Sequence, residues 1–185
     1  MTVLTLPPVP ASRIEPDTQQ DVPDDPAALA ASIDALTALL AGGLPPAEEL
    51  TVRARLGVEL RLARRLDEAL AVLTAEVALA RRVAEPWRVQ HARIRLAHVH
   101  QWRREFGVSD ALFADLLGVE QVPARTRAFT LQHAGRNAYD QGRWAEAGEL
   151  FAAALAIRER IGAPADQIES SRGALVAARN RMGEQ

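Results

Sequence analysis

The chain has 185 residues, of which 48% are hydrophobic, 25% are charged and 4% are aromatic, and its formal net charge is −2. This is the composition of a globular protein, and it excludes collagen-like chains, disordered chains and membrane bundles. The small net charge argues against a general nucleic-acid binder. Because aromatic residues are so few, alanine and leucine must fill the core, which favours closely packed helices.

Two missing residue types exclude further classes of chemistry. The chain has no cysteine, so disulfides, thiolate catalysis and cysteine-ligated metal sites are excluded. All 22 cationic residues are arginine, so neither a Schiff-base lysine nor the lysine of a phosphate-binding P-loop is available.

Residues 1–25 are predicted to form a disordered, acidic, proline-rich tail. This segment has one arginine against five carboxylates and offers few apolar side chains to bury. It lacks the basic start and the unbroken apolar run of a signal peptide. No other segment is apolar enough to span a membrane, so we expect a cytoplasmic protein.

From Asp25 onward the pattern is helical, and no stretch alternates with the period of a strand. Asp25 is a candidate N-cap, and Pro26 suits the first position of a helix. The glycine pair at 42–43 should end that helix, which predicts an N-terminal helix over 26–43. Four later prolines, spaced 40, 37 and 41 residues apart, are predicted to begin further helices: Pro46, Pro86, Pro123 and Pro164.

Small and large residues recur in the same order between these prolines, which is typical of a helical solenoid. A small residue on each helix of a pair lets the two helices approach closely, and a large residue four positions later is expected to pack into the next pair. The first small positions are Gly57, Ala97 and Gly135, the second are Ala69, Ser109 and Ala147, and the large ones are Leu73, Phe113 and Phe151.

At these positions the chain resembles the tetratricopeptide repeat (TPR) family in its longer-period bacterial form. The repeat that matches best runs from His133 to Ile157. The resemblance covers three repeats over 46–162 and a C-terminal capping helix over 164–182. It implies an all-α fold in which αα-hairpins stack as a right-handed TPR-like superhelix of about eight helices.

A search for catalytic motifs finds none, so we expect no enzyme activity and assign no catalytic, cofactor or metal residues. Three histidines lie close in sequence, at His91, His98 and His100, but their spacing does not suit a metal, and a structural role is expected. The arginine-rich pieces at 61–65, 81–82 and 103–104 alternate with acidic residues. We interpret them as solvated helix faces with ion pairs, not as a nucleic-acid site.

The resemblance also implies a peptide-binding groove, because the first helices of successive TPR repeats line a concave surface. Carrying those positions over gives a mixture of aromatic, arginine and glutamine side chains, of which the first two are favoured at hot spots. Arginine at both ends predicts an acidic partner, and the central aromatics predict that it has apolar anchors. The predicted groove residues are Arg61, His91, Ile94, His98, Gln101, Trp102, Phe129, Gln132, Arg136 and Tyr139.

The sequence therefore predicts a non-catalytic scaffold or adaptor that binds a segment of a protein partner. The alternatives are a self-associating homodimer and a sensor subunit that binds a small molecule or a signalling peptide to regulate transcription. A hydrolase using His91 and His98 is a further, weaker alternative. The groove could instead be filled by the N-terminal helix, or by the acidic tail acting in cis or in a neighbouring molecule.

Overall fold

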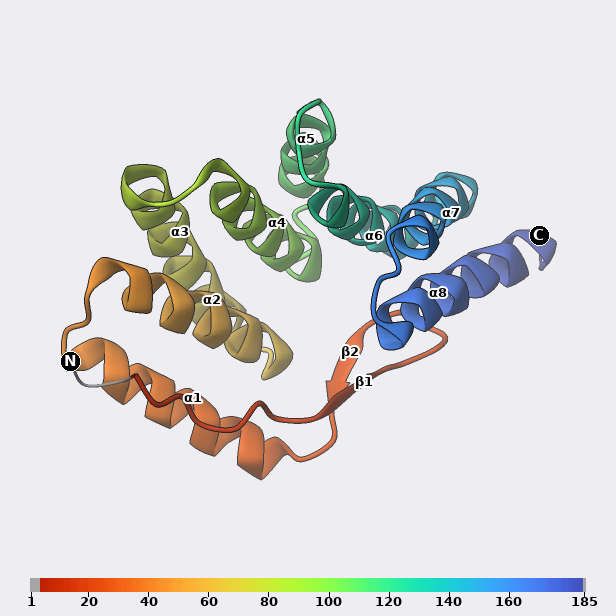
Figure 1. Cartoon of the computed structure of the whole chain (residues 1–185). Helices are drawn as coiled ribbons and strands as arrows, with labels where there is room; N and C mark the ends of the chain where they lie inside the picture. Colours follow the sequence, from red (N-terminus) through yellow and green to blue (C-terminus); the bar gives the residue numbers. More distant parts are fainter. Residues whose placement is uncertain (1–3, 185) are drawn as a thin grey trace. The chain divides into compact units, whose positions relative to one another are not determined.

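The computed structural model describes residues 4–184, which contain eight helices and two short strands (Figure 1). The described chain forms two compact units. The first unit contains residues 4–14 and 21–103, and the second contains residues 15–20 and 104–184. The predicted all-α fold of αα-hairpins is confirmed in both. None of the described helices has the length and apolar character needed to cross a membrane.

The first unit packs four helices in chain order. They are α1 (Pro26–Ala41), α2 (Pro46–Leu62), α3 (Leu66–Val83) and α4 (Pro86–Trp102). Each helix packs against the next, and α4 also contacts α2, as successive hairpins of a solenoid do. The core of this unit is aliphatic and includes Leu36, Val52 and Leu73, all of which are fully buried.

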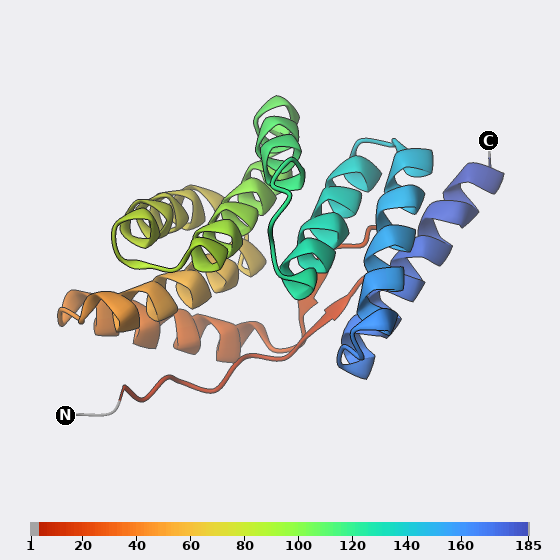
Figure 2. The same cartoon turned by 45° about the horizontal axis from the view of Figure 1, so that its top comes forward.

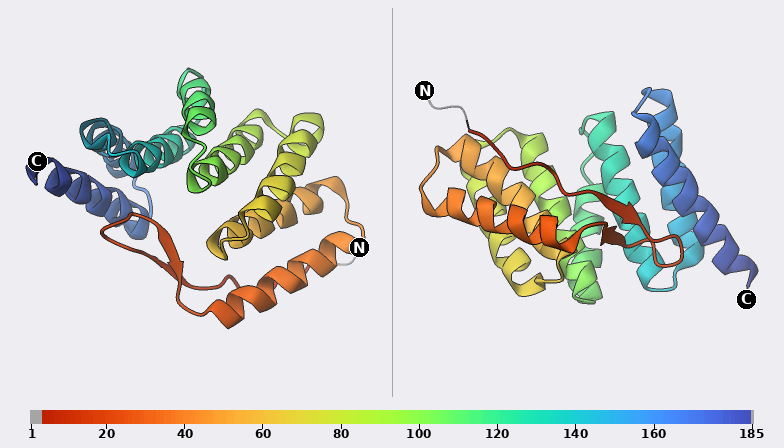
Figure 3. Two further views of the ribbon diagram at one scale, coloured as in Figure 1. Left: turned by 180° about the vertical axis from the view of Figure 1, so that it is seen from behind. Right: turned by 90° about the horizontal axis from the view of Figure 1, so that it is seen from below.

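The second unit also packs its helices in chain order. They are α5 (Phe106–Leu117), α6 (Ala124–Asp140), α7 (Trp144–Arg160) and α8 (Ala165–Gly183). Figure 3 shows α6, α7 and α8 side by side, and α8 contacts both of the other two. The core of this unit is built on the fully buried ring of Phe151 and on small residues such as Ala138 and Ala178.

The N-terminal segment is structured over the described residues, so the prediction of a disordered tail is wrong for residues 4–24. Strands β1 (Ser12–Ile14) and β2 (Asp21–Pro23) pair in antiparallel fashion in the first unit. Residues 4–11 run beside α1, where Leu4 and Leu6 pack on the core (Figures 1 and 2). The strands are too short to show an alternating pattern in the sequence.

The helix starts follow the capping signals. The Oδ1 atom of Asp25 accepts hydrogen bonds from the backbone N–H groups of Ala27 and Ala28, at 2.9 and 3.0 Å. This N-cap satisfies donors that have no partner within the helix. Prolines 46 and 86 are the first residues of α2 and α4, whereas prolines 123 and 164 directly precede α6 and α8.

The turns that follow α2, α4 and α6 share one backbone feature. Arg64, Arg104 and Gly142, which are 40 and 38 residues apart, all have positive φ angles, of 61°, 61° and 74°. Only glycine adopts this left-handed conformation without steric cost. The turn therefore repeats with the period of the sequence, although two of its three copies carry an arginine.

Two glycines determine how closely the helices of a hairpin approach. A Cβ atom added at Gly135 in α6 would lie 2.6 Å from the ring of Phe151 in α7, and one added at Gly57 in α2 would overlap Leu73 in α3. Leu73 and Phe151 thus pack on the glycine of their own hairpins. Each also belongs to a core that includes the next helix of its unit, with Val99 of α4 for Leu73 and Ala174 of α8 for Phe151.

We expect Gly135→Ala to lower the free energy of unfolding by about 1–3 kcal/mol, because the buried ring of Phe151 cannot move away from an added methyl group. The matched control is Gly173→Ala in α8, where a Cβ atom would meet nothing within 4 Å. That change should stabilise the helix by roughly 0.5–1 kcal/mol. Urea denaturation of both variants measures the difference, and equal effects would contradict the packing described above.

Candidate functional site

The first unit contains a cavity of about 540 Å³ between α2, α3, α4 and the N-terminal segment, and we call it the α2–α4 cavity. Three of its lining residues, Val9, Pro10 and Ser12, come from the N-terminal segment. His91, one of the predicted groove residues, also lines it, together with Thr51, Ala54 and Val58 of α2. The main apolar side chains of the wall are Leu50, Ala54, Val58, Leu62, Ala80 and Trp87.

Two buried carboxylates also line the α2–α4 cavity. Glu76 in α3 is bound at both oxygens by the guanidinium of Arg95 in α4. Glu59 in α2 accepts a hydrogen bond from Nε of Arg55 at 2.7 Å, through Oε1 alone. Both glutamates are less than 5% exposed, and buried carboxylates need such partners because desolvation of an isolated charge is costly.

Arg55 joins this ion pair to the N-terminal segment. Its Nη1 and Nη2 atoms donate to the backbone carbonyl oxygens of Pro7 and Pro8, and Nη2 also donates to Oγ of Ser32 at 3.0 Å. Proline has no N–H group, so a proline-rich segment offers only acceptors to a neighbouring helix. A guanidinium, which is purely a donor, is the complementary group.

His91 and Trp87 stand one turn apart on α4 at the α2–α4 cavity, with their rings edge to face and 5.6 Å between centroids. The pKa of His91 lies below its ordinary value of 6.5, chiefly because burial disfavours the charged ring and secondly because Arg95 repels a positive charge. The imidazole is therefore neutral at pH 7.

The lowered pKa of His91 makes stability depend on pH. The unfolded chain binds this proton near pH 6.5 and the folded chain binds it only at lower pH, so stability is lost as pH falls below about 6.5. We expect the melting temperature of His91→Gln to fall less than that of the wild type between pH 7.5 and pH 5. Calorimetry between pH 7.5 and pH 5 measures both melting temperatures. Equal decreases in the wild type and in His91→Gln would contradict the expected pH dependence.

The predicted groove residues of the first unit are mostly buried, which corrects the expectation that they face solvent or a partner. His91 alone is half-buried at the α2–α4 cavity. The others are between 0% and 6% exposed, and they are Arg61, Ile94, His98, Gln101 and Trp102.

Arg61 lies at the centre of this buried group and binds the N-terminal segment. Its Nη2 atom donates to Oδ2 of Asp21 in β2 at 2.9 Å. Its guanidinium also stacks on the ring of Trp102, 4.2 Å from the centroid, and Arg64 stacks there as well at 4.3 Å. Trp102 in turn donates from Nε1 to Nε2 of His98 at 3.1 Å. An acidic, extended segment thus already meets the arginine predicted to bind one.

We expect Asp21→Asn to lower the free energy of unfolding by about 1–3 kcal/mol, because it weakens a charge-assisted hydrogen bond to a buried guanidinium. Asp24→Asn is the matched control. Asp24 pairs with Arg13 in the same segment at the same 2.9 Å, but both side chains are about half exposed, so the loss should stay below about 1 kcal/mol. Chemical denaturation measures the free energy of unfolding of both variants. Equal decreases would mean that the burial of Arg61 does not strengthen its ion pair with Asp21.

In the second unit, three of the four predicted groove residues are buried and only Phe129 is half-buried. Gln132 accepts hydrogen bonds through Oε1 from Ser171 at 2.6 Å and from Arg158 at 3.4 Å. Burial and, after it, the positive charge of Arg136 lower the pKa of Arg158. These residues therefore hold α6, α7 and α8 together.

Tyr139 is the fourth groove residue of the second unit. Its hydroxyl donates to the backbone carbonyl of Asp17 at 3.0 Å and accepts a hydrogen bond from Arg181 in α8 at 3.4 Å. Asp17 belongs to the turn over 15–20, whose contacts lie within this unit. In each unit, therefore, one predicted groove residue binds a piece of the N-terminal segment.

No group of three potential metal ligands occurs within residues 4–184. His98 accepts a hydrogen bond from Trp102, so it has the structural role expected of it. The arginine-rich pieces at 61–65 and 103–104 form ion pairs, as predicted, for example Arg65 with Glu68 and Arg103 with Asp67. However, the expectation that these faces are solvated is wrong for Glu59 and Arg61, which are buried.

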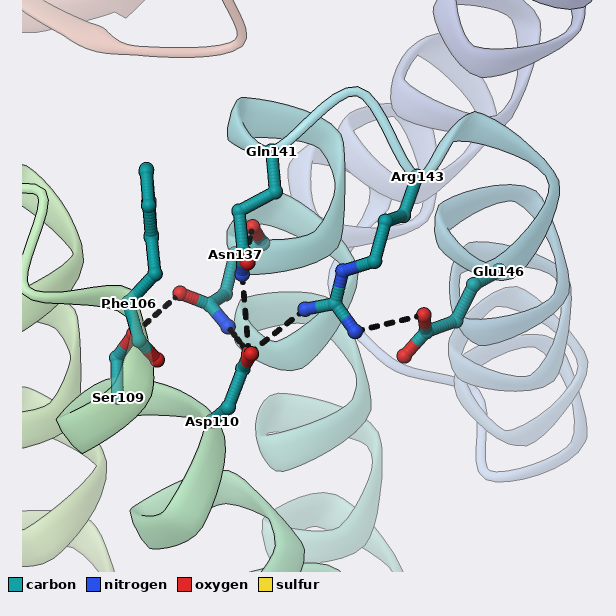
Figure 4. Close-up of polar contacts among 7 residues, drawn as sticks. All are labelled: Phe106, Ser109, Asp110, Asn137, Gln141, Arg143 and Glu146. Carbon is teal, nitrogen blue, oxygen red and sulfur yellow. Dashed lines mark hydrogen bonds and ion pairs between the residues drawn. The ribbon is translucent and has the colours of Figure 1, made fainter.

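A second polar cluster joins three helices of the second unit (Figure 4). Asp110 in α5 accepts hydrogen bonds from Asn137 at 2.5 Å, from Gln141 at 3.0 Å and from Arg143 at 2.7 Å. The neighbouring Ser109, which is fully buried, donates to Oδ1 of Asn137 at 2.7 Å. Arg143, the N-cap residue of α7, also donates to Glu146 of that helix at 2.8 Å, so the cluster fixes α5 against α6 and the start of α7.

Sequence reasoning missed the carboxylates of the α2–α4 cavity. Glu76 stands among the buried apolar residues Leu73, Val77 and Ala80 of α3, and a charged residue on such a face was the available signal. A buried glutamate at such a position requires a cation on the next helix, and Arg95 provides it. Glu59 gave no signal, since it lies in a run of alternating charges.

Comparison with known proteins supports the fold. No protein-family model matches the chain, and no curated protein matches it either. Among solved structures, the chain is similar to a kinesin light chain-like protein with nearly identical TPR-like repeats from Podosopora anserina. The TM-score is 0.59 with 17% identity over 86% of this chain and 81% of the other. At this identity the likeness establishes a TPR-like helical-repeat fold.

Proposed function

We propose that this chain is a non-catalytic scaffold that binds a segment of a protein partner at the groove positions of its TPR-like repeats. The observation that carries the proposal is the ion pair between Arg61 and Asp21, in which a buried guanidinium at a groove position takes the carboxylate of an extended segment. Arginine stacked on tryptophan, as Arg61 is on Trp102, is a combination enriched at hot spots.

The partner segment is acidic with apolar anchors, and the N-terminal segment of the chain occupies its position in cis. Two features support this. Asp21 supplies the charge, and Leu4 and Leu6 supply apolar contacts. Because a tethered segment has a high effective concentration, a partner must compete with it, which weakens the apparent affinity of the resting protein.

A fluorescently labelled peptide of residues 4–24 tests the proposal as a probe of known composition. We expect it to bind the full-length variant Asp21→Arg at least tenfold more tightly than the wild type, a difference of about 1.4 kcal/mol. The physical reason is that Arg61 repels the altered segment in cis and leaves its position to the peptide. Fluorescence anisotropy gives the dissociation constants.

Asp17→Arg is the matched control for this experiment. It makes the same charge change in the same segment, but within residues 4–184 Asp17 binds the helices through its backbone carbonyl and not through its carboxylate. This variant should bind the peptide like the wild type. Equal affinity for all three proteins, or no binding to any, would overturn the proposal. Light scattering of the same samples distinguishes a homodimer that exchanges its segments, because its mass rises with concentration.

A further inference from the structure

The α2–α4 cavity has the dimensions of a small-molecule site. Its volume of about 540 Å³ falls within the range of roughly 300–1,000 Å³ that is usual for such sites. Its wall is mainly apolar, with Leu50 and Val58 on α2, Ala80 on α3 and Trp87 on α4, and it has a few polar groups among them. Drug-sized ligands are bound in surroundings of this kind, where apolar walls supply affinity and a few polar atoms fix the orientation.

One polar atom of this wall is buried without a hydrogen-bond partner among residues 4–184. It is Oε2 of Glu59, a residue that is 4% exposed and lines the α2–α4 cavity. An unsatisfied buried acceptor is costly, and more so when it is charged. Glu76, the other carboxylate of the wall, has both oxygens bound by Arg95.

Arg55 does not satisfy the second oxygen of Glu59. Its Nε atom holds Oε1, while its two terminal nitrogens donate to the carbonyls of Pro7 and Pro8 and to Ser32. Turning the guanidinium to bind Glu59 at both oxygens would break those bonds. Oε2 therefore remains an acceptor that requires a donor from another molecule.

The charges of the wall indicate that this donor is neutral. Arg55, Arg88 and Arg95 face two glutamates, and His91 is uncharged at pH 7 because its pKa is lowered, so the wall carries one net positive charge. This charge disfavours a cation, and the open oxygen of Glu59 disfavours an anion. A hydroxyl or an amide N–H is uncharged and can still donate a hydrogen bond to Oε2 of Glu59.

We propose that the α2–α4 cavity binds a neutral, mostly apolar small molecule that donates a hydrogen bond from an O–H or N–H group to Oε2 of Glu59. Trp87 at the wall is 43% exposed and offers an aromatic face to a flat ligand. The proposal depends only on residues of the first unit and does not require that a protein partner binds.

Two probes that differ only in the donor test this inference. They are 1-naphthalenemethanol, which has a hydroxyl donor, and its methyl ether, which has none. We expect the full-length wild type to bind the alcohol at least tenfold more tightly than the ether, as followed by NMR shifts of the Trp87 indole N–H. Equal binding of the two probes, or binding of neither, would overturn the proposal.

Three variants assign the preference to the proposed atom. In Glu59→Gln the amide can still accept from Arg55, but it presents an N–H₂ group where Oε2 was, so the preference for the alcohol should fall below twofold. Glu76→Gln alters the other carboxylate of the same wall and should keep the tenfold preference. Ala54→Phe fills the cavity from a half-buried position and should abolish binding of both probes. Circular dichroism checks that each variant is folded.

A preference that survives Glu59→Gln would place the donor site elsewhere and refute the assignment. If Glu59→Gln does not fold, the comparison of the two probes on the wild type and on Ala54→Phe still decides whether a donor-selective site exists in this cavity. Binding that Ala54→Phe leaves unchanged would also refute the proposal.

Discussion

The close approach of paired helices at glycine is the constraint on which the repeat packing depends. Gly57 in α2 and Gly135 in α6 leave out a side chain where Leu73 and Phe151 enter from the following helix. A buried large residue then fills the space that glycine opens, as close packing of a protein interior requires. Only 4% of the residues are aromatic, so large rings cannot fill the core of this chain. Pairing a glycine with a large side chain achieves close packing between the helices instead.

Within the first unit, the N-terminal segment completes a surface that the helices leave polar. Arg55 and Arg61 both lie on α2 and are largely buried, so each requires acceptors in place of water. The proline carbonyls at 7 and 8 and the carboxylate of Asp21 supply them. The same helix thus binds this segment at two places through hydrogen-bond donors, in addition to the apolar contacts of Leu4 and Leu6.

Local signals made most of the fold predictable. The N-cap at Asp25, the prolines before the helices and the recurring small residues all act within one helix or one hairpin, and their physical effects are local. The strand pair and the burial of Arg61 were not predictable in this way, because Asp21 lies 40 residues away and its pairing depends on how the folded chain brings the two together. The TPR resemblance gave no sign that Arg61 and Tyr139 would bind the chain's own N-terminal segment.

The N-terminal segment belongs both to the wall of the α2–α4 cavity, through Val9 and Pro10, and to the ion pair of Arg61, through Asp21. Any molecule that packs against that wall therefore adds to the free energy that holds the segment in position. By thermodynamic reciprocity, a competitor that removes the segment must weaken the affinity of the cavity by the same factor. A short piece of extended chain would in this way couple two binding equilibria without any helix changing its place.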